Sequence, residues 1–449
     1  MSQGTIKSQQ RERSAAAAVG AQNRHSAPFF EHFGIVLDNA EGVYFAGQEI
    51  VGKVVIECRE PRRVSELLLE VKGRARTHWT KSRKTCSANE AYFCEQFNTE
   101  YTRKLPKAED YEQQQRRERG GAERTAAERR KDSIKLMGRT LHAGTHEIPF
   151  SYVLPKNLPN SFEGEFGFVR YTCRAVCESP WDFDTVCFLP FTVVGIEDLN
   201  CEAELLSLPL ETRCSHSVGA FCVRLGSVST ELRIARGGFT PGESVRVNAK
   251  VRNESRRTLR GSKTFAGAEQ QRTTTNVVQT VRAKNVPSGG EFECSAMPLT
   301  VPSVPPRLTP KCRLIDVTYC VELSCRTPPF CVSLPVVIGT IPLLPPNLRN
   351  TIGQKVLNNG TPFGRADDES GGEKEEDNLD SETERNCASK KRVRMPSSVL
   401  SELYPALPTP CFRELHSGPV KVADERERKF QFGPNLFTPK HPFYVDGVF

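Results

Sequence analysis

Two stretches of the sequence decide the fold, because they are versions of one pattern. Residues 44–57 read Tyr44-Phe-Ala-Gly-Gln-Glu-Ile-Val-Gly-Lys-Val-Val-Ile-Glu, and residues 239–252 read Phe239-Thr-Pro-Gly-Glu-Ser-Val-Arg-Val-Asn-Ala-Lys-Val-Arg. Each has a turn with glycine, at Gly47 and Gly242, that leads into alternating apolar and polar residues. This period of two is typical of a strand with one face on a core and the other in solvent. The pattern therefore predicts that one β-structural unit occurs twice.

Two further segments recur in the same order after these stretches. Glu147–Pro155 parallels Ala296–Pro302, and Val169–Val176 parallels Val317–Ser324. One such match could arise by coincidence, but three in the same order indicate a duplication. Together with the glycine and proline between segments, the repeat predicts an all-β protein. We expect two tandem antiparallel β-sandwich domains of immunoglobulin-like architecture.

The spacing of the repeats predicts the domain boundaries. The copies are offset by 195 residues at Gly47 and Gly242 and by 148 residues at Tyr171 and Tyr319, so the first copy is longer by 47 residues. The charged segment 101–139 accounts for most of this difference, and we expect a flexible polar insert there. The predicted division is a disordered N-terminus at 1–30, a first sandwich at 31–196, a second sandwich at 197–346 with a hinge near 195–200, and a disordered polar tail at 347–449.

Composition and charge exclude several classes of protein. Only 37% of the 449 residues are hydrophobic and 31 are proline, which argues against a largely helical globule. The sequence has no run of 18 apolar residues and no apolar segment of signal-peptide length near its start, so we expect a cytoplasmic protein. The chain has 62 basic and 54 acidic residues. Because the tail is slightly acidic, the positive excess lies in the body and suits acidic partners.

Motifs typical of catalysis or of a metal site are missing from the sequence. It has no H-E-x-x-H, G-x-S-x-G, P-loop or G-x-G-x-x-G pattern. Its 16 cysteines form no C-x-x-C pair, and we interpret them as reduced, mainly core residues. His142 and His146 lie in a glycine-containing turn, where their spacing is weak evidence for metal. Positive and negative charges are mixed, which argues against nucleic-acid binding. We expect no enzyme activity, no cofactor and no metal.

Several segments carry a resemblance to a known family. The opening of the first predicted sandwich, Phe33-Gly-Ile-Val-Leu-Asp-Asn with 44–54, resembles the start of the arrestin N-terminal domain. Other segments resemble the α-arrestin branch, the arrestin domain-containing proteins, in particular. These are residues 144–155, 158–164 and 167–171, Pro180-Trp181 and Asp198-Leu199-Asn200. The resemblance covers about 31–345 and agrees with the tandem sandwich inferred from the repeat.

The resemblance implies a scaffold without catalysis. Members of that branch act as cytoplasmic adaptors, associated with the plasma membrane or endosomes, that bind membrane-protein cargo or receptors. They link this cargo to ubiquitin ligases and to endocytic or sorting machinery. Two alternatives stay open, namely a receptor-desensitising signalling arrestin and a retromer-like structural trafficking subunit.

In that family the tail binds WW domains of HECT-type ubiquitin ligases through Pro-Pro-x-Tyr motifs. This chain has two degenerate versions and no intact copy. In the first, Thr409-Pro410-Cys411-Phe412, Thr409 replaces a proline and Phe412 replaces the tyrosine. In the second, His441-Pro442-Phe443-Tyr444, His441 replaces the first proline. Losing one stacking ring or one hydroxyl weakens binding by about 1–2 kcal/mol, about tenfold in affinity. We therefore expect weak WW ligands here, with a solvated tail as the alternative.

Charged segments suggest one further partner. The insert 101–139 and the basic block Lys390–Arg394 could contact anionic lipid, and the basic block could also be a nuclear-localisation signal. For both segments, ordinary solvated charge is the simpler interpretation.

Overall fold

The structure is a computed structural model, and it describes a defined set of residues. These are 30–81, 84–97, 99, 139–178, 184–220, 223–259, 274, 276–281, 284–327, 329–346, 407, 409–422 and 430–445. Among them, no helix has the length and apolar character needed to cross a membrane. The predicted N-terminus at 1–30 lies outside this set apart from Phe30, as do the insert apart from Arg139 and the tail between 347 and 406.

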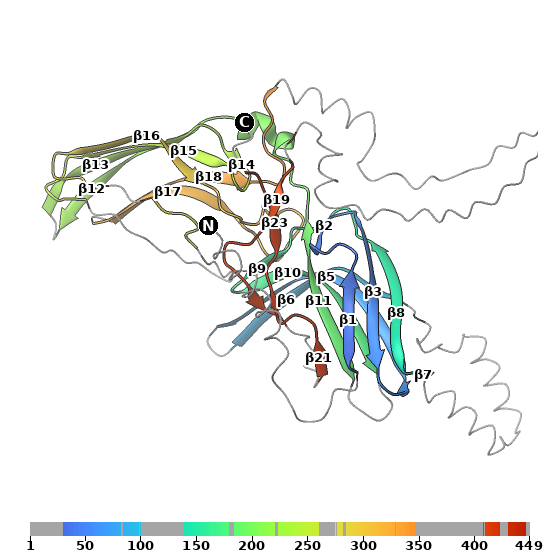
Figure 1. The fold of residues 1–449 in the computed structure, drawn as a ribbon. Helices are drawn as coiled ribbons and strands as arrows, with labels where there is room; N and C mark the ends of the chain where they lie inside the picture. Colours follow the sequence, from blue (N-terminus) through green and yellow to red (C-terminus); the bar gives the residue numbers. More distant parts are fainter. Residues whose placement is uncertain are drawn as a thin grey trace, which may run out of the picture.

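The first domain is a β-sandwich of two sheets (Figure 1). The smaller sheet has the order β1-β3-β8, made of β1 (His32–Leu37), β3 (Glu49–Cys58) and β8 (Gly144–Val153). The larger sheet has the order β2-β11-β10-β5-β6, with β9 added on β10. Its strands are β2 (Val43–Phe45), β5 (Glu66–Lys81), β6 (Lys84–Phe97), β9 (Phe162–Gly164), β10 (Gly167–Glu178) and β11 (Thr185–Val194). β4 (Arg62–Val64) and β7 (Arg139–Leu141) form a separate two-stranded sheet.

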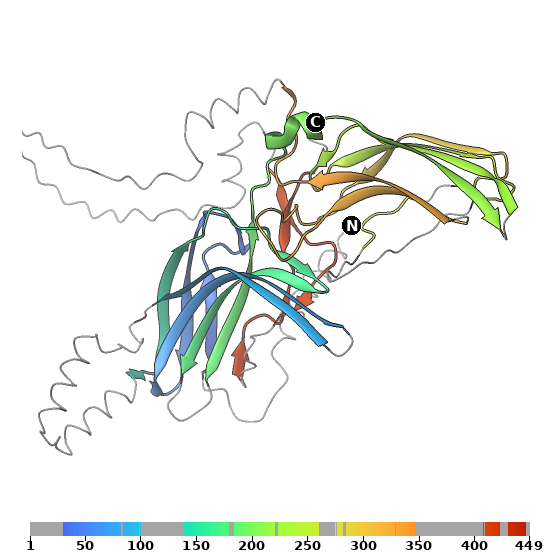
Figure 2. The same cartoon turned by 180° about the vertical axis from the view of Figure 1, so that it is seen from behind.

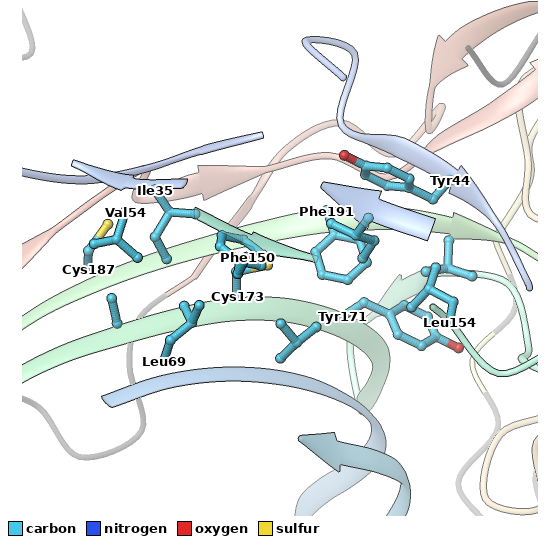
Figure 3. Close-up of a cluster of buried hydrophobic side chains, with 14 of the residues drawn as sticks. Ile35, Tyr44, Val54, Leu69, Phe150, Leu154, Tyr171, Cys173, Cys187 and Phe191 are labelled. Atoms are coloured by element: carbon cyan, nitrogen blue, oxygen red, sulfur yellow. The ribbon is translucent and has the colours of Figure 1, made fainter. Parts of the chain in front are cut away.

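The core of this domain follows from the period of two. In β3 every second residue is buried, so Ile50, Val54 and Ile56 face the opposite sheet. The ring of Phe191 packs against those of Tyr44 and Tyr171 (Figure 3). The hydroxyl of Tyr171 is buried with them and donates to the carbonyl oxygen of Pro159 at 2.7 Å. This satisfies the polar atom that the ring brings into the core.

The cysteines of the described residues are free thiols. Cys173, Cys177 and Cys187 are buried in the first domain among aliphatic side chains. Burial raises the pKa of Cys187 to about 11, because the thiolate is disfavoured away from water. These thiols are protonated at neutral pH and act as small apolar residues.

The second domain repeats the sandwich. A four-stranded sheet has the order β12-β13-β15-β16, with β12 (Leu210–Ala220), β13 (Val223–Ile234), β15 (Ser244–Asn253) and β16 (Glu291–Thr300). It faces a three-stranded sheet of β14 (Gly238–Phe239), β18 (Pro329–Ile338) and β17 (Tyr319–Arg326). Between the domains lie a short 3₁₀ helix, η2 (Leu199–Glu202), and a single helical turn, α4 (Ala203–Leu206).

The duplication extends to individual hydrogen bonds at the two glycine turns. Gly47 donates to the carbonyl of Pro155, and Gly242 donates to that of Val301. Both glycines have a left-handed backbone, with φ of 87° and 99°. The side chain of the next residue closes each turn, because Gln48 accepts from the Phe45 amide at 3.0 Å and Glu243 accepts from the Thr240 amide at 2.7 Å. The predicted tandem β-sandwich fold is therefore confirmed.

The tail differs from the expectation of a polar segment without regular structure. Its described residues contain five short strands: β19 (Cys411–Glu414), β20 (Val420–Lys421), β21 (Phe430–Phe432), β22 (Leu436–Phe437) and β23 (Lys440–Phe443). β19 pairs with β23, β20 pairs with β22, and β21 adds to β11 of the first domain. The prediction relied on the low apolar fraction of residues 347–449. It did not allow for a few aromatic residues in the tail that pack against the two domains. The expectation is thus corrected for 409–422 and 430–445.

Candidate docking segment at the domain joint

The two degenerate proline-aromatic motifs lie side by side. β19 and β23 pair antiparallel, with Phe412 opposite Pro442 and Cys411 opposite Phe443. They cross the joint between the domains, where Figure 1 and Figure 2 show both strands from opposite sides. The two strands are not consecutive in the sequence, because β20, β21 and β22 lie between them. For brevity we call the paired residues 409–416 and 439–445 the docking hairpin. Motifs that were predicted as separate ligands are thus one paired structure.

Tyr444 is seated in the second domain. Its side chain is 1% exposed, and its hydroxyl donates to the carbonyl oxygen of Thr340 at 3.0 Å. Its amide donates to the carbonyl oxygen of Pro241, also at 3.0 Å. Burial raises the pKa of the phenol far above its usual value, so the hydroxyl remains a donor. The tyrosine expected to bind a WW domain is therefore buried against residues of its own chain.

The same turn explains why Gly242 is required. A Cβ built on Gly242 would lie 2.0 Å from the carbonyl oxygen of Tyr444, which is shorter than any contact a side chain makes. Glycine thus provides both the left-handed backbone of the turn and the space in which the hairpin backbone lies.

His441 is completely buried, and neither of its ring nitrogens has a hydrogen-bond partner. Burial lowers the pKa of the imidazole to about 3, because the charged form would lose its hydration. The ring is therefore neutral at physiological pH. Its neighbour Phe443 is also buried, and the guanidinium of Arg413 stacks over the Phe443 ring at 3.8 Å.

The first domain holds the other side of the docking hairpin. The rings of Phe412 and Phe45 pack edge to face, with centroids 6.2 Å apart. The Lys440 amide donates to the hydroxyl of Thr192 at 3.2 Å, and the Lys440 ammonium donates to the carbonyl of Glu41 at 3.4 Å.

An apolar cluster joins both domains and the tail. The first domain contributes Val43, Phe45 and Val194, and the second contributes Ile341 and Leu344. The tail contributes Leu407, with Phe412 packed at the edge. Pro410 is buried nearby, whereas Thr409 is exposed. Of the predicted site residues, Thr409 is thus the one that lies at the surface on this side.

A second tail segment lies on the first domain. β21 adds to β11 in parallel, with Gln431 opposite Val186. Phe432 packs edge to face on Phe33 at 6.2 Å between ring centroids. The following residue, Gly433, has a φ of 103°, and a Cβ there would lie 2.1 Å from the carbonyl oxygen of Phe188. This position therefore also depends on glycine.

Charged residues hold the connection between the domains, where the sequence predicts a hinge near 195–200. The carboxylate of Glu197 is 7% exposed and forms ion pairs with Arg307 and Lys311. Arg307 also pairs with Glu202, whose pKa the hydrogen bond from Arg307 lowers. The backbone oxygen of Glu197 accepts from the Thr340 amide at 2.8 Å. Sequence reasoning missed these residues, because the two cations lie more than 100 positions from the carboxylate.

A further ion pair holds the connector between β16 and β17 on the first domain. Glu90 of β6 accepts from the backbone amide of Arg313 at 3.0 Å and from its guanidinium at 2.8 Å. Burial alone raises the pKa of Glu90, but Arg313 outweighs it and holds this pKa below its usual value. Leu308 and Cys312 of the same connector join the core of the first domain.

Among the described residues, no group of three or more histidine, cysteine or acidic side chains is placed to hold a metal ion. His146 instead lies with its ring nitrogen 2.8 Å from the carbonyl of His142. Pro180-Trp181 and the basic block Lys390–Arg394 lie outside the described residues.

Two joined β-sandwiches with ion pairs at their connection define the class of protein by its fold. The family model described as "Arrestin (or S-antigen), N-terminal domain" matches residues 33–200. The model described as "Arrestin (or S-antigen), C-terminal domain" matches residues 224–343. The chain belongs to the arrestin family, in the branch of arrestin domain-containing proteins.

Named relatives support the same assignment. The chain is 42% identical to "Arrestin domain-containing protein 17" of Caenorhabditis elegans, over 93% of this chain and 99% of that protein. It is 30% identical to "Arrestin domain-containing protein 4" of Homo sapiens, over 74% of this chain and 75% of that protein. A weaker match, 28% over 45% of this chain and 48% of that protein, is to human "Arrestin domain-containing protein 1".

Proposed function

We propose that this protein is a non-catalytic adaptor that binds membrane-protein cargo and couples it to ubiquitin ligases and sorting machinery. The observation that carries the proposal is membership of the arrestin domain-containing branch across both domains. The adaptor acts in the cytoplasm at the plasma membrane or on endosomes, where the net positive charge of +8 favours contact with anionic lipid.

The coupling step uses the docking hairpin. Pro442 and Tyr444 keep the second proline and the tyrosine that a WW domain reads, and Pro410 with Phe412 offers a poorer copy. Both copies bind weakly, since each lacks a proline ring and the copy that ends in Phe412 also lacks a hydroxyl. The partners are HECT-type ubiquitin ligases.

Capture of isolated WW domains by the full chain tests this coupling. Weak capture that falls at least tenfold in the double variant Tyr444→Ala, Phe412→Ala supports docking at the hairpin. Strong capture that survives both substitutions places the docking site elsewhere. Proximity labelling in the native cell type identifies the cargo, and enrichment of membrane proteins is the expected result.

Two outcomes would replace the adaptor proposal. A gain in receptor affinity that depends on receptor phosphorylation would identify a signalling arrestin. Stable co-purification with a large coat partner would identify a retromer-like structural subunit.

A further inference from the structure

We propose that the free edge of β6, over Phe93–Phe97, binds an extended basic segment of a membrane-protein cargo by β-strand addition. This inference rests on the proposed function in one respect, namely that the segment belongs to such a cargo. The binding edge itself follows from the pairing, exposure and charge of the described residues.

β6 is the last strand of the larger sheet of the first domain. It is paired with β5 along its length, and no described strand pairs with its other side. Its sequence contains neither proline nor glycine, whereas the edge strands β8 and β16 contain Pro149 and Pro298. Proline removes a hydrogen-bond donor and so protects an edge from pairing. The open side of β6 therefore presents backbone N–H and C=O groups with which a further strand can pair.

A bulge divides this edge into two runs. The register between β5 and β6 shifts after Gly73, so that Tyr92 has no partner on β5. On the N-terminal side of the bulge, the side chain of Glu90 is already bound by Arg313 of the connector between β16 and β17. Phe93–Phe97, on the other side, is the run that the described residues leave open.

Three half-buried aromatic rings line this run, and we call Phe93, Phe97 and Tyr152 the aromatic ledge. The Tyr152 ring of β8 lies 5.3 Å from the ring of Phe93 and 6.1 Å from that of Phe97, between centroids. Gly73 of β5 makes room for this arrangement, because a Cβ there would lie 2.5 Å from the Phe93 ring. Apolar side chains of an added strand would cover these rings, and cross-strand pairs with aromatic residues stabilise a sheet.

Glu95 determines which strand can be added. It lies opposite Val71, between the two β6 rings of the aromatic ledge and on the same face of the strand. Glu95 is exposed and forms no ion pair with the described residues. Lys72 lies opposite Cys94 and so belongs to the other face of the sheet. An added strand would cover the Glu95 carboxylate, and a buried carboxylate without a partner is costly. The strand must therefore bring a cation to this position.

These contacts specify the chemistry of the partner segment. It is extended, with a lysine or arginine beside Glu95 and apolar residues two positions before and after, so that all three side chains point to one face. Cytoplasmic segments next to the membrane-spanning helices of membrane proteins are rich in lysine and arginine. Such segments fit this edge, whereas Glu95 would repel an acidic segment.

A designed peptide provides the probe. A fluorescently labelled peptide, Thr-Val-Thr-Arg-Thr-Val-Thr, is titrated onto the full-length chain beside a control peptide in which glutamate replaces the arginine. We expect the arginine peptide to bind about tenfold more tightly, and Glu95→Lys to reverse this preference. Glu165→Lys, at an exposed position in the turn between β9 and β10, should leave the preference unchanged. No binding of the arginine peptide, or binding that Glu95→Lys does not alter, would overturn the inference.

Methylation of the peptide amides tests the backbone pairing separately. In an added strand only alternate amides donate to the neighbouring strand. Methylating one alternate set should abolish binding, and methylating the other set should leave most of it, while the side chains stay the same. Binding of the unmethylated peptide should also slow hydrogen exchange at alternate amides of Phe93–Phe97. Equal effects of the two methylated sets would overturn strand addition, since the peptide would then bind through side chains alone.

A second copy of the chain is the competing occupant of this edge. Sedimentation of the free protein, with hydrogen exchange measured at several protein concentrations, distinguishes the two occupants. A monomer whose Phe93–Phe97 amides exchange at the same rate at every concentration supports the cargo segment. A dimer in which these amides are protected without peptide would overturn it.

Proximity labelling with the wild-type chain and with Glu95→Lys separates this inference from the proposed function. Enrichment of membrane proteins that falls about fivefold or more in Glu95→Lys supports both. Enrichment that is unchanged in Glu95→Lys overturns this inference and leaves the adaptor function intact. Peptide binding that depends on Glu95, without any enrichment of membrane proteins by the wild-type chain, overturns the cargo proposal, while strand addition at β6 stands.

Discussion

The hydroxyl of Tyr444 donates to the carbonyl oxygen of Thr340 across 104 residues of sequence, at 3.0 Å and away from solvent. Thr340 belongs to the segment that follows β18 and leads back to the hinge. The bond thus joins the tail, the second domain and the hinge. It also keeps Tyr444, a residue of one of the two candidate WW motifs, away from solvent.

Tyr444→Phe removes this hydroxyl and leaves the ring in place. We expect the free energy that holds Tyr444 in its buried position to fall by about 1–1.5 kcal/mol, since the buried Thr340 carbonyl loses a partner. The amide of Tyr444 should exchange about fivefold to tenfold faster. Tyr319→Phe is the control, because its hydroxyl bonds within the second domain, to Pro305. Equal effects of both variants at this amide would contradict the role of the Thr340 bond.

The contacts that hold the docking hairpin on the two domains should weaken in acid. Burial lowers the pKa of His441 from its ordinary value of 6.5 to about 3, so the seated form excludes a proton that the released form binds. The contribution to stability is complete above pH 6.5 and is lost as the pH falls from 6.5 toward 3. At pH 5 the equilibrium should favour release about 30-fold more than at pH 8.

Exchange of the Tyr444 amide as a function of pH, corrected for intrinsic exchange, measures this dependence. His441→Leu keeps an apolar side chain of similar size and removes the titrating group. It should abolish the portion of the pH dependence between 6.5 and 5. An unchanged profile in His441→Leu would show that another group causes the effect.

Glu197→Gln tests the hinge. The substitution removes the charge that Arg307 and Lys311 share and leaves two partly buried cations without it. We expect the free energy of unfolding to fall by about 2 kcal/mol, as measured by denaturant titration. Glu204→Gln, on the exposed face of α4, should change it by less than about 0.5 kcal/mol. Comparable losses in both variants would contradict a special role for Glu197.

Arg170→Lys tests a second buried ion pair, in the first domain. Arg170 binds Glu163 through two nitrogens, at 2.6 and 2.7 Å, and stacks over Phe168 at 4.0 Å. Lysine keeps the charge but cannot form the fork or the stack, so we expect a loss of about 1–2 kcal/mol in the free energy of unfolding.

The matched control is the exposed pair of Lys53 and Glu147. Lys53→Met should cost less than about 0.5 kcal/mol, since exposed ion pairs contribute little. Burial raises the pKa of Glu163 and the Arg170 charge opposes that rise, so Arg170→Lys should raise it further. A pKa of Glu163 that does not change, measured by NMR titration, would argue against the bidentate contact.

The two sandwiches could be predicted from the sequence, because alternation is a local requirement of a strand that buries one face. Residues 44–57 and 239–252 satisfy it within a dozen positions, and their glycine turns specify where each strand begins. The proline-aromatic motifs could likewise be recognised in the sequence. Their identity needs no knowledge of what lies beside them.

The contacts of those motifs, in contrast, depend on how the whole chain folds. Cys411 pairs with Phe443, and the hydroxyl of Tyr444 donates to the carbonyl of Thr340. Both contacts depend on how the two domains are placed relative to each other. The tail has too few apolar residues for a core of its own, so its strands form against surfaces supplied by the rest of the chain. Contacts over more than 100 residues leave no periodic pattern, and for this reason the buried state of the docking hairpin could not be inferred from the sequence.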